Sequence, residues 1–166
     1  MIRPLTPDDA AIYHAIRLEA LSAEAASFAT TLEEQAARSL EQVAKTLSET
    51  TVFGAFIDGQ LVGTAGYARN APVKEAHKGL VWGMYLRPSA RGGGLAGALL
   101  DTVIDYARGK VEQLTLIVVS DNMPAVRLYE SRGFARWGLE PRALKLADGR
   151  YTVDGYYWLP LTGPEA

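Results

Sequence analysis

The sequence predicts an α+β fold, with one domain over residues 1–166 in which a mixed, mostly antiparallel sheet of six to seven strands is flanked by about four helices. Two observations support this fold class. The chain has 166 residues, of which 48% are hydrophobic and 22% are charged, and such proportions are typical of one packed domain. The predicted elements run strand, helices, three antiparallel strands, and then helix, strand, helix and two strands, an order that favours helices packed on one sheet.

The composition excludes several classes of function. A formal net charge of -2 argues against a nucleic-acid partner held by a broad basic surface. The chain has no cysteine and two histidines, which excludes disulfides and thiolate nucleophiles and leaves little for a metal centre. No apolar stretch is long enough to cross a membrane and no apolar signal core follows Met1, so we expect a cytoplasmic protein without a membrane partner.

The first half of the chain predicts helices followed by a hairpin. A strand over residues 1–3 precedes a helix that Thr6 caps and that reaches Leu21. Apolar residues at four-residue steps predict the face that this helix buries, namely Ile12, Ile16 and Ala20. Two capping boxes divide residues 32–48 into one broken helix or two short ones.

A β-hairpin follows these helices. Residues 51–57 alternate as a strand, Asp58-Gly59 forms a two-residue turn, and residues 60–69 return as the partner strand. Residues 77–87, which are rich in β-branched and aromatic side chains, predict a third strand that Pro88 ends.

The second half alternates helices with strands. Apolar residues at helical spacing predict a helix from Leu95 to about Ala107, and the nearly all-apolar residues 113–119 predict a strand buried on both faces. Asn122 caps a short helix that ends near Ser131 and is followed by Gly133. Strands over residues 134–139 and 151–161 complete the sheet.

A glycine cluster between a strand and a helix predicts an anion site. Free backbone N–H groups and the positive end of the helix dipole can receive a phosphate there, and glycines allow its close approach. A P-loop does not fit, because no Lys-Ser or Lys-Thr follows the glycines. A dinucleotide fingerprint matches Gly92, Gly94 and Gly97, but too little chain follows it to build several βα units. A flexible turn with a helix cap is the simpler alternative.

Two motifs carry a family resemblance. The run from Arg91 to Gly97 resembles motif A of the GNAT superfamily of N-acetyltransferases, whose pattern [QR]-x-x-G-x-[GA] is filled by Arg91, Gly94 and Ala96. Residues 122–134 resemble the second signature of that family, N-x-x-A-x-x-L-Y-x-x-x-G-F. The predicted order of elements also agrees with the family fold.

The resemblance implies a binding site for acetyl-CoA and roles for particular residues. It implies that Tyr129 is the general acid that protonates the departing thiolate and that Asn122 contacts the cofactor. The remaining cofactor-binding residues that it implies are Met84, Tyr85, Leu86, Arg91, Gly92, Gly93, Gly94, Leu95, Ala96 and Gly97. The alternatives are a structural or solvent-facing Arg91 and a half-buried core tyrosine at position 129.

The general base is the gap in this pattern. Some family members carry a glutamate on the strand before Asn122, but here that stretch is Leu-Ile-Val-Val. Glu75 and His77, at the start of the strand that leads to the cofactor site, are weak candidates.

We therefore expect an acetyl-CoA-dependent N-acetyltransferase that transfers acetyl to a primary amine of a small molecule or peptide in a direct ternary complex, because no cysteine can carry an acyl-enzyme. The alternative is a non-catalytic acyl-CoA-binding module of the same fold. The aromatic-rich residues 151–158 are a candidate surface for a homodimer.

Overall fold

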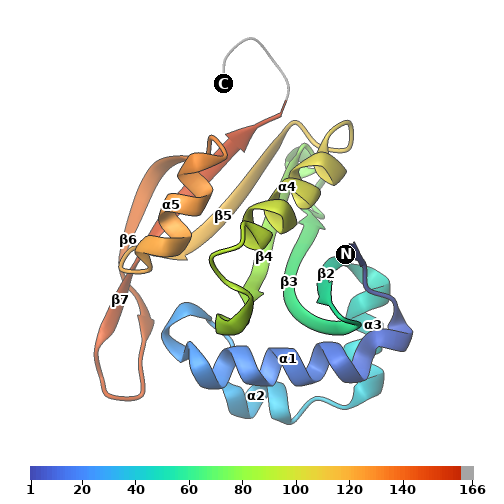
Figure 1. The fold of residues 1–166 in the computed structure, drawn as a ribbon. Helices are drawn as coiled ribbons and strands as arrows, with labels where there is room; N and C mark the ends of the chain where they lie inside the picture. Colours follow the sequence, from blue (N-terminus) through green and yellow to red (C-terminus); the bar gives the residue numbers. More distant parts are fainter. Residues whose placement is uncertain (162–166) are drawn as a thin grey trace.

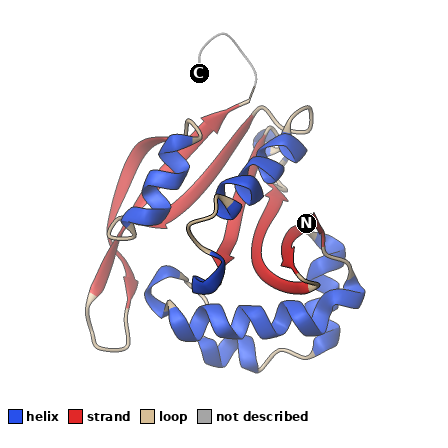
Figure 2. Cartoon of the chain, in the orientation of Figure 1, coloured by secondary structure: helices blue, strands red, loops and turns tan. Residues whose placement is uncertain are grey.

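The computed structural model describes residues 1–161, which form a seven-stranded sheet in the order β1-β2-β3-β4-β5-β7-β6 (Figures 1 and 2). The strands are β1 (Ile2–Pro4), β2 (Thr51–Ile57), β3 (Gln60–Arg69), β4 (Lys78–Leu86), β5 (Gln113–Val119), β6 (Ala135–Lys145) and β7 (Tyr151–Pro160). Neighbouring strands are antiparallel except β4 and β5, which are parallel. The predicted mixed, mostly antiparallel sheet is confirmed.

Helices cover both faces of this sheet. They are α1 (Ala10–Ala23), α2 (Leu32–Ala36), α3 (Leu40–Glu49), α4 (Leu95–Ala107) and α5 (Met123–Ser131). One buried cluster joins α4 and α5 to the sheet, and a second joins α1 and α3 to the opposite face of β2, β3 and β4. None of the helices in residues 1–161 is long and apolar enough to span a membrane.

The N-cap residues of α2 and α3 mark the starts of these helices where the sequence predicts. The Thr31 and Ser39 side chains accept hydrogen bonds from the N–H groups of Glu34 and Gln42, at 3.1 and 3.2 Å. Residues 32–48 therefore form two short helices. At the first helix, Thr6 is followed by a single 3-10 turn over Pro7–Asp9 before α1 begins.

Two burial predictions are wrong. Ile12 is 42% exposed, because α1 buries Tyr13, Ile16 and Ala20 instead. Ile117 is 51% exposed, so β5 is not covered on both faces. The cluster that includes α1 and α3 contains no residue of β5, which leaves this side of the strand uncovered within residues 1–161.

The neighbouring strands β4 and β5 pair over only one end of their length. Lys78, Gly79 and Leu80 lie opposite residues 113–115 of β5, and no pair follows them. Beyond this point β5 continues to pair with β7, whereas β4 continues with β3. The two halves of the sheet therefore separate toward the ends of β4 and β5.

A β-bulge in β4 bends the strand where the sheet separates. Between the pairs Thr64–Tyr85 and Gly66–Trp82, β3 contributes one residue and β4 contributes two, Gly83 and Met84. Gly83 has a φ of 60°, which is a left-handed conformation that glycine adopts without a steric cost. The extra residue places Trp82 and Tyr85 on the same face of the sheet, where both pack in the cluster with α1.

The N-terminal ion pair makes stability dependent on pH. Arg3 holds both carboxylate oxygens of Asp9, at 2.7 and 2.8 Å, and lowers the pKa of Asp9 to about 2. The unfolded chain binds a proton at higher pH than the folded chain, so this stabilisation is present above pH 4 and is lost as pH falls toward 2. We expect Asp9→Asn to lower the stability at pH 7 by about 1 kcal/mol and the Tm by roughly 2–4 °C.

Thermal melts between pH 7 and pH 2 test this expectation. The difference in Tm between wild type and Asp9→Asn should shrink below pH 4. Asp8→Asn is the matched control, because Asp8 is exposed and forms no ion pair within residues 1–161. An equal effect of both substitutions at pH 7 would contradict the role of the pair.

Candidate active site

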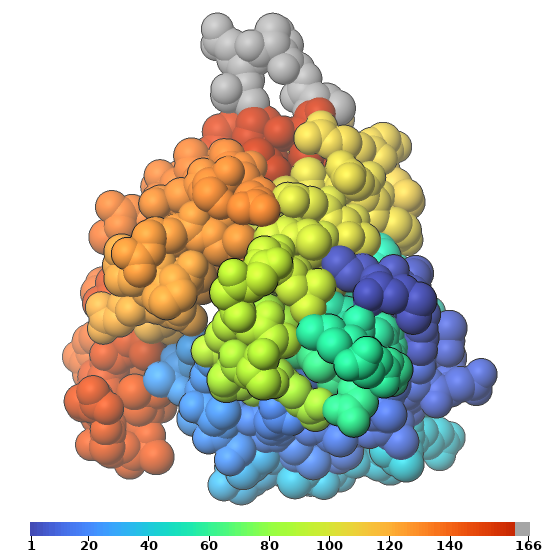
Figure 3. Space-filling view, in the orientation of Figure 1, coloured from blue at the N-terminus to red at the C-terminus, as the bar shows by residue number. Residues whose placement is uncertain are grey.

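A cavity of about 660 Å³ lies where β4 and β5 separate, and this volume is within the range of small-molecule sites. In the space-filling view, the orange α5, the yellow-green segment before α4 and the blue residues after α1 meet on one face (Figure 3). All the residues that the sequence predicts for the site line this cavity except Gly93: Met84, Tyr85, Leu86, Arg91, Gly92, Gly94, Leu95, Ala96, Gly97, Asn122 and Tyr129.

The backbone of β4 is open on the side of the cavity. The Arg87 N–H donates to the Val62 carbonyl of β3 at 2.8 Å, and backbone groups point alternately to the two sides along a strand. The N–H groups of Leu86 and Met84 therefore point away from β3, toward the space that β5 has left. The backbone of Tyr85 faces β3, so this residue contributes its side chain to the cavity wall.

The N-terminus of α4 forms another wall. Gly94 is the N-cap with a φ of 78°, and Gly92 has a φ of 85°; both conformations are open to glycine. The Ala98 N–H makes the first bond of the helix, to the Gly94 carbonyl at 3.0 Å. The N–H groups of residues 94–97 therefore have no partner within the helix and form an anion site with its positive dipole.

Arg132 adds a positive charge beside this helix end. Its guanidinium donates to the Asp101 carboxylate of α4 at 3.1 and 3.3 Å. A Cβ placed on Gly97 would lie 2.0 Å from Nη2 of Arg132, so a larger residue there would push the tip of the arginine away from the first turn. Gly97 thus serves the approach of Arg132 as well as that of a ligand.

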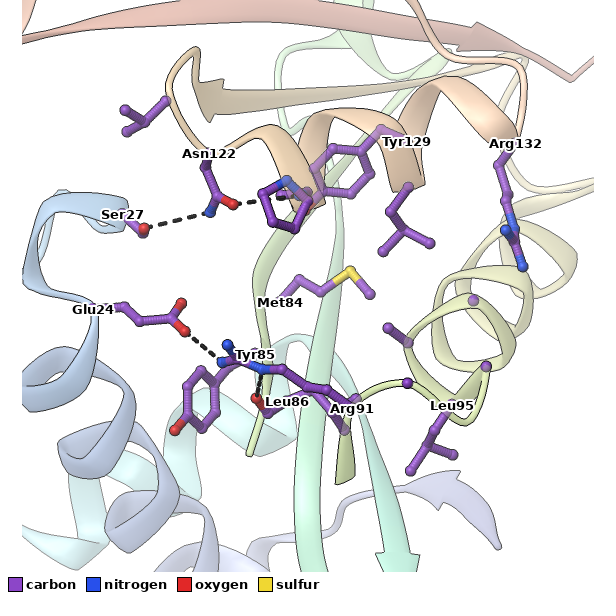
Figure 4. A pocket seen from close by; sticks show the side chains of 18 of the residues that line it. Glu24, Ser27, Met84, Tyr85, Leu86, Arg91, Leu95, Asn122, Tyr129 and Arg132 are labelled. Atoms are coloured by element: carbon purple, nitrogen blue, oxygen red, sulfur yellow. Dashed lines mark hydrogen bonds and ion pairs between the residues drawn. The ribbon is translucent and has the colours of Figure 1, made fainter. Parts of the chain in front are cut away.

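Arg91 connects three parts of the site (Figure 4). Its Nε donates to the Leu86 carbonyl at 2.9 Å, and its Nη2 forms an ion pair with Glu24, just after α1. Arg91 therefore fixes the end of β4 to the loop before α4. Its ion pair also holds Glu24, in the segment after α1, at the opposite wall of the cavity. The structural role that the sequence left open for Arg91 is present in this arrangement.

Asn122 links α5 to the same wall. Its Oδ1 accepts a hydrogen bond from the Ala125 N–H at 3.3 Å, which caps α5, and its Nδ2 lies 3.5 Å from the Ser27 hydroxyl (Figure 4). Glu24 precedes the short 3-10 turn over Ala25–Ser27 and Ser27 is its last residue, so two side-chain contacts hold this segment against the cavity.

Tyr129 lies seven residues after Asn122, on the same side of α5. It is 8% exposed, packs edge-to-face on Phe134, and lines the cavity (Figure 4). Burial raises the pKa of Tyr129 to about 12, so the phenol is neutral at physiological pH. Its hydroxyl has no hydrogen-bond partner within residues 1–161 and is free to donate to a ligand.

The acids near the site are held by arginines and tyrosines. Glu19 of α1 accepts from the Tyr85 hydroxyl at 3.1 Å and forms an ion pair with Arg87 at 2.8 Å. Burial, followed by the hydrogen bond to Glu19, raises the pKa of Tyr85 to about 12. Tyr85 is therefore a fixed hydrogen-bond donor to Glu19.

The structure does not bring Glu75 or His77 to the cavity. Glu75 is exposed and accepts a hydrogen bond from Asn70 at 2.9 Å, and neither residue lines the cavity. The carboxylates that do line it are Glu24 and Asp121. Within residues 1–161, no group of three His, Cys, Asp or Glu residues is placed to hold a metal ion.

Sequence reasoning missed part of the lining. The missed residues come mostly from the segment after α1, the end of β5 and the exposed turn of α5: Glu24, Ala26, Ser27, Val119, Asp121, Pro124, Ala125, Leu128 and Arg132. Pro124, Ala125, Leu128 and Arg132 lie inside the second motif, so its helical spacing is the signal that could have found them. The segment after α1 has no such pattern.

The fold and the cavity agree with the family resemblance of the two motifs. A sheet that opens between two parallel strands lies beside an anion site at a helix N-terminus. The sequence model of the Acetyltransferase (GNAT) family matches residues 14–134. The chain belongs to this family, as its two motifs indicate.

Known proteins support this assignment. The chain is 37% identical over 95 residues to a mycothiol acetyltransferase of Acidothermus cellulolyticus, a match that covers 50% of this chain and 29% of the relative. The chain thus spans less than a third of that relative. A ribosomal-protein-alanine N-acetyltransferase of Brucella melitensis is 27% identical with a TM-score of 0.84, and the alignment covers 97% of this chain and 99% of that structure.

A third relative carries a ligand. The structure of yncA, a putative acetyltransferase of Salmonella typhimurium, was solved with its cofactor acetyl-CoA. It has a TM-score of 0.80 and 22% identity, and the alignment covers 100% of this chain and 96% of that structure. This similarity establishes the shared fold.

Proposed function

We propose that the chain is an acetyl-CoA-dependent N-acetyltransferase that acts on a primary amine. One observation carries the proposal: open backbone N–H groups on β4, the free N-terminus of α4 and the Tyr129 hydroxyl surround one cavity. The residues fit acetyl-CoA because the N–H groups of residues 94–97 and the nearby Arg132 suit its phosphates.

The residues divide the work of the reaction. Acetyl-CoA supplies an activated acetyl thioester. The N–H groups of Met84 and Leu86 point to where the carbonyl oxygen gains charge as the amine nitrogen attacks, and so stabilise the transition state. As the new C–N bond forms and the C–S bond breaks, Tyr129 donates its proton to the leaving sulfur. Neither Glu75 nor His77 lines the cavity, so the amine loses its own proton to solvent, and solvent returns a proton to Tyr129.

The alternatives differ in ligand and in turnover. A dinucleotide site is disfavoured, because the only parallel pair of strands in residues 1–161 is β4–β5 and a dinucleotide fold needs a mostly parallel sheet. A non-catalytic acyl-CoA-binding module would bind acetyl-CoA without releasing thiol in the presence of amines.

We also propose a homodimer through the C-terminal aromatic segment. Tyr151 is 41% exposed and available to a partner, whereas Tyr157 is 2% exposed and belongs to the core. Any such surface would therefore exclude Tyr157.

The glycine loop gives the first test. We expect acetyl-CoA, at about 100 times its Kd, to stabilise the protein by roughly 2.7 kcal/mol in a thermal melt, and NAD to have no effect. Gly94→Glu should abolish this shift, because a carboxylate would occupy the anion site.

Gly149→Glu is the matched control for this test. Gly149 has a φ of 84° and open space around it, as Gly94 has at 78°, so both substitutions strain the backbone equally. Gly149 lies outside the cavity, and its variant should keep the full shift. A normal shift in Gly94→Glu would remove the loop from the site.

Tyr129→Phe gives the second test. We expect kcat to fall by about 100-fold or more with little change in acetyl-CoA affinity, because only the proton donor is lost. Steady-state thiol release and equilibrium binding measure the two effects. Tyr67→Phe, which removes another buried hydroxyl but outside the cavity, should leave kcat unchanged. Unchanged turnover in Tyr129→Phe would leave this tyrosine a structural role only.

A further inference from the structure

Arg17 of α1 is a buried cation without a partner. It is 7% exposed, and its Nη1 is fully shielded from solvent without a hydrogen bond. Within residues 1–161 its guanidinium forms no ion pair or hydrogen bond, and its contact is with the ring of Phe28, 4.9 Å away. Burying an unpaired charge is costly, so such a group requires an explanation in terms of a ligand or ion.

The nearby acids do not neutralise Arg17. Glu19 is bound to Arg87, and Glu24 is bound to Arg91. The groups whose charges act on Arg17 are Tyr13, a buried phenol, and Arg38, a second cation. Burial lowers the pKa of the Arg17 guanidinium, Tyr13 raises it and Arg38 lowers it, and no carboxylate is among these groups.

Arg17 lies beside the bulge that opens the sheet. Its Nη1 is 3.7 Å from the position that a Cβ of Gly83 would occupy. Gly83 immediately precedes Met84, whose N–H faces the cavity. The indole Nε1 of Trp82, the residue before Gly83, is a second buried donor without a partner. Two unsatisfied donors thus lie on the α1 side of β4, opposite α4 and α5, behind the wall of the cavity rather than in its lining.

We propose that Arg17 binds the carboxylate of the acceptor, and that the acceptor is a free α-amino acid whose amino group is acetylated. This inference rests on the proposed function. An arginine recognises a carboxylate with parallel hydrogen bonds.

The spacing along β4 favours an α-amino acid. Adjacent Cα atoms are about 3.8 Å apart. The Arg17 Nη1, which lies 3.7 Å from where a Cβ of Gly83 would stand, is therefore close to the next residue, Met84, whose N–H faces the cavity. An attacking nitrogen lies about 3–3.5 Å from the carbonyl carbon. A carboxylate attached to the carbon that carries the amine spans this short separation. The N-terminus of a peptide has a neutral amide at that position, which accepts a hydrogen bond but leaves the charge of Arg17 uncompensated.

The experiment compares each L-α-amino acid with its α-carboxamide, which stands for a peptide N-terminus. Thiol release is measured at saturating acetyl-CoA with the full chain. We expect the best amino acid to exceed its carboxamide in kcat/KM by about 10- to 100-fold, as a charge-assisted hydrogen bond predicts. In Arg17→Met this ratio should fall to about one, and Arg17→Lys should retain part of it.

Arg38→Met is the matched control. It removes a positive charge from the same region, but Arg38 already donates to the Gln42 carbonyl and the Thr46 hydroxyl, at 3.0 and 2.6 Å. In Arg38→Met, the ratio of kcat/KM for the amino acid to kcat/KM for its carboxamide should therefore equal that of the wild type. Equal rates for acid and carboxamide in the wild type, or an equal loss of ratio in Arg38→Met, would overturn the proposal.

The stability of the ligand-free protein gives a readout that does not depend on turnover. If the cation awaits a ligand, Arg17→Met should melt at the same or a higher temperature, because an apolar side chain replaces an unpaired buried charge. Amino acids added with CoA should raise the Tm of the wild type but not of Arg17→Met. A clear fall in the Tm of ligand-free Arg17→Met would show that the cation is structural and would overturn the proposal.

These arms separate the two proposals. If thiol release is equally fast with amino acids and with their carboxamides, the proposed acceptor class is wrong and the proposed acetyltransferase activity still stands. Absence of both thiol release and an acetyl-CoA shift would overturn the acetyltransferase. In that case the anion site at Arg17 is tested by the Tm alone. It is supported if amino acids raise the Tm, carboxamides do not, and the shift is lost in Arg17→Met. It is overturned if amino acids give no such shift.

Discussion

The separation of β4 from β5 is the constraint on which the site depends. One extra residue at Gly83 bends β4, and pairing with β5 stops after Leu80. A continuous sheet would satisfy the N–H groups of Met84 and Leu86 with β5 carbonyls. Because the strands separate, these groups remain available to a ligand in the cavity. The loss of ladder hydrogen bonds is the structural cost of a preorganised site.

Positive groups lie on both sides of this opening, and the acids Glu19 and Glu24 beside it are held in ion pairs. Arg132 and the N-terminus of α4 are positive on one side, and Arg17 is positive on the other. The acids of α1 and its following turn, Glu19 and Glu24, are each held by an arginine from the segment between β4 and α4. The ion pairs thereby keep carboxylates away from positions where a negatively charged ligand group would lie.

Local patterns in the sequence predicted the sheet, the helices and many of the residues that line the cavity. Asn122 and Gly94 are N-caps whose signal is contained in a few adjacent residues. The roles of Arg17, Glu24 and Arg132 depend on residues distant in the chain, and an arginine within an amphipathic helix carries no local sign of burial. The exposure of Ile117 could not be predicted from local sequence either, because it depends on which strands α1 and α3 cover.

The segment over residues 24–28 belongs to both halves of the site. Glu24 and Ser27 contact Arg91 and Asn122 on the cofactor side, while Phe28 covers Arg17 on the other. A ligand contact that shifts this turn on one side therefore also acts on the side chains that face the other half. Any coupling between the two halves that results is reciprocal by thermodynamic linkage. The turn thus joins the two halves of the site through side chains rather than through the hydrogen bonds of the sheet.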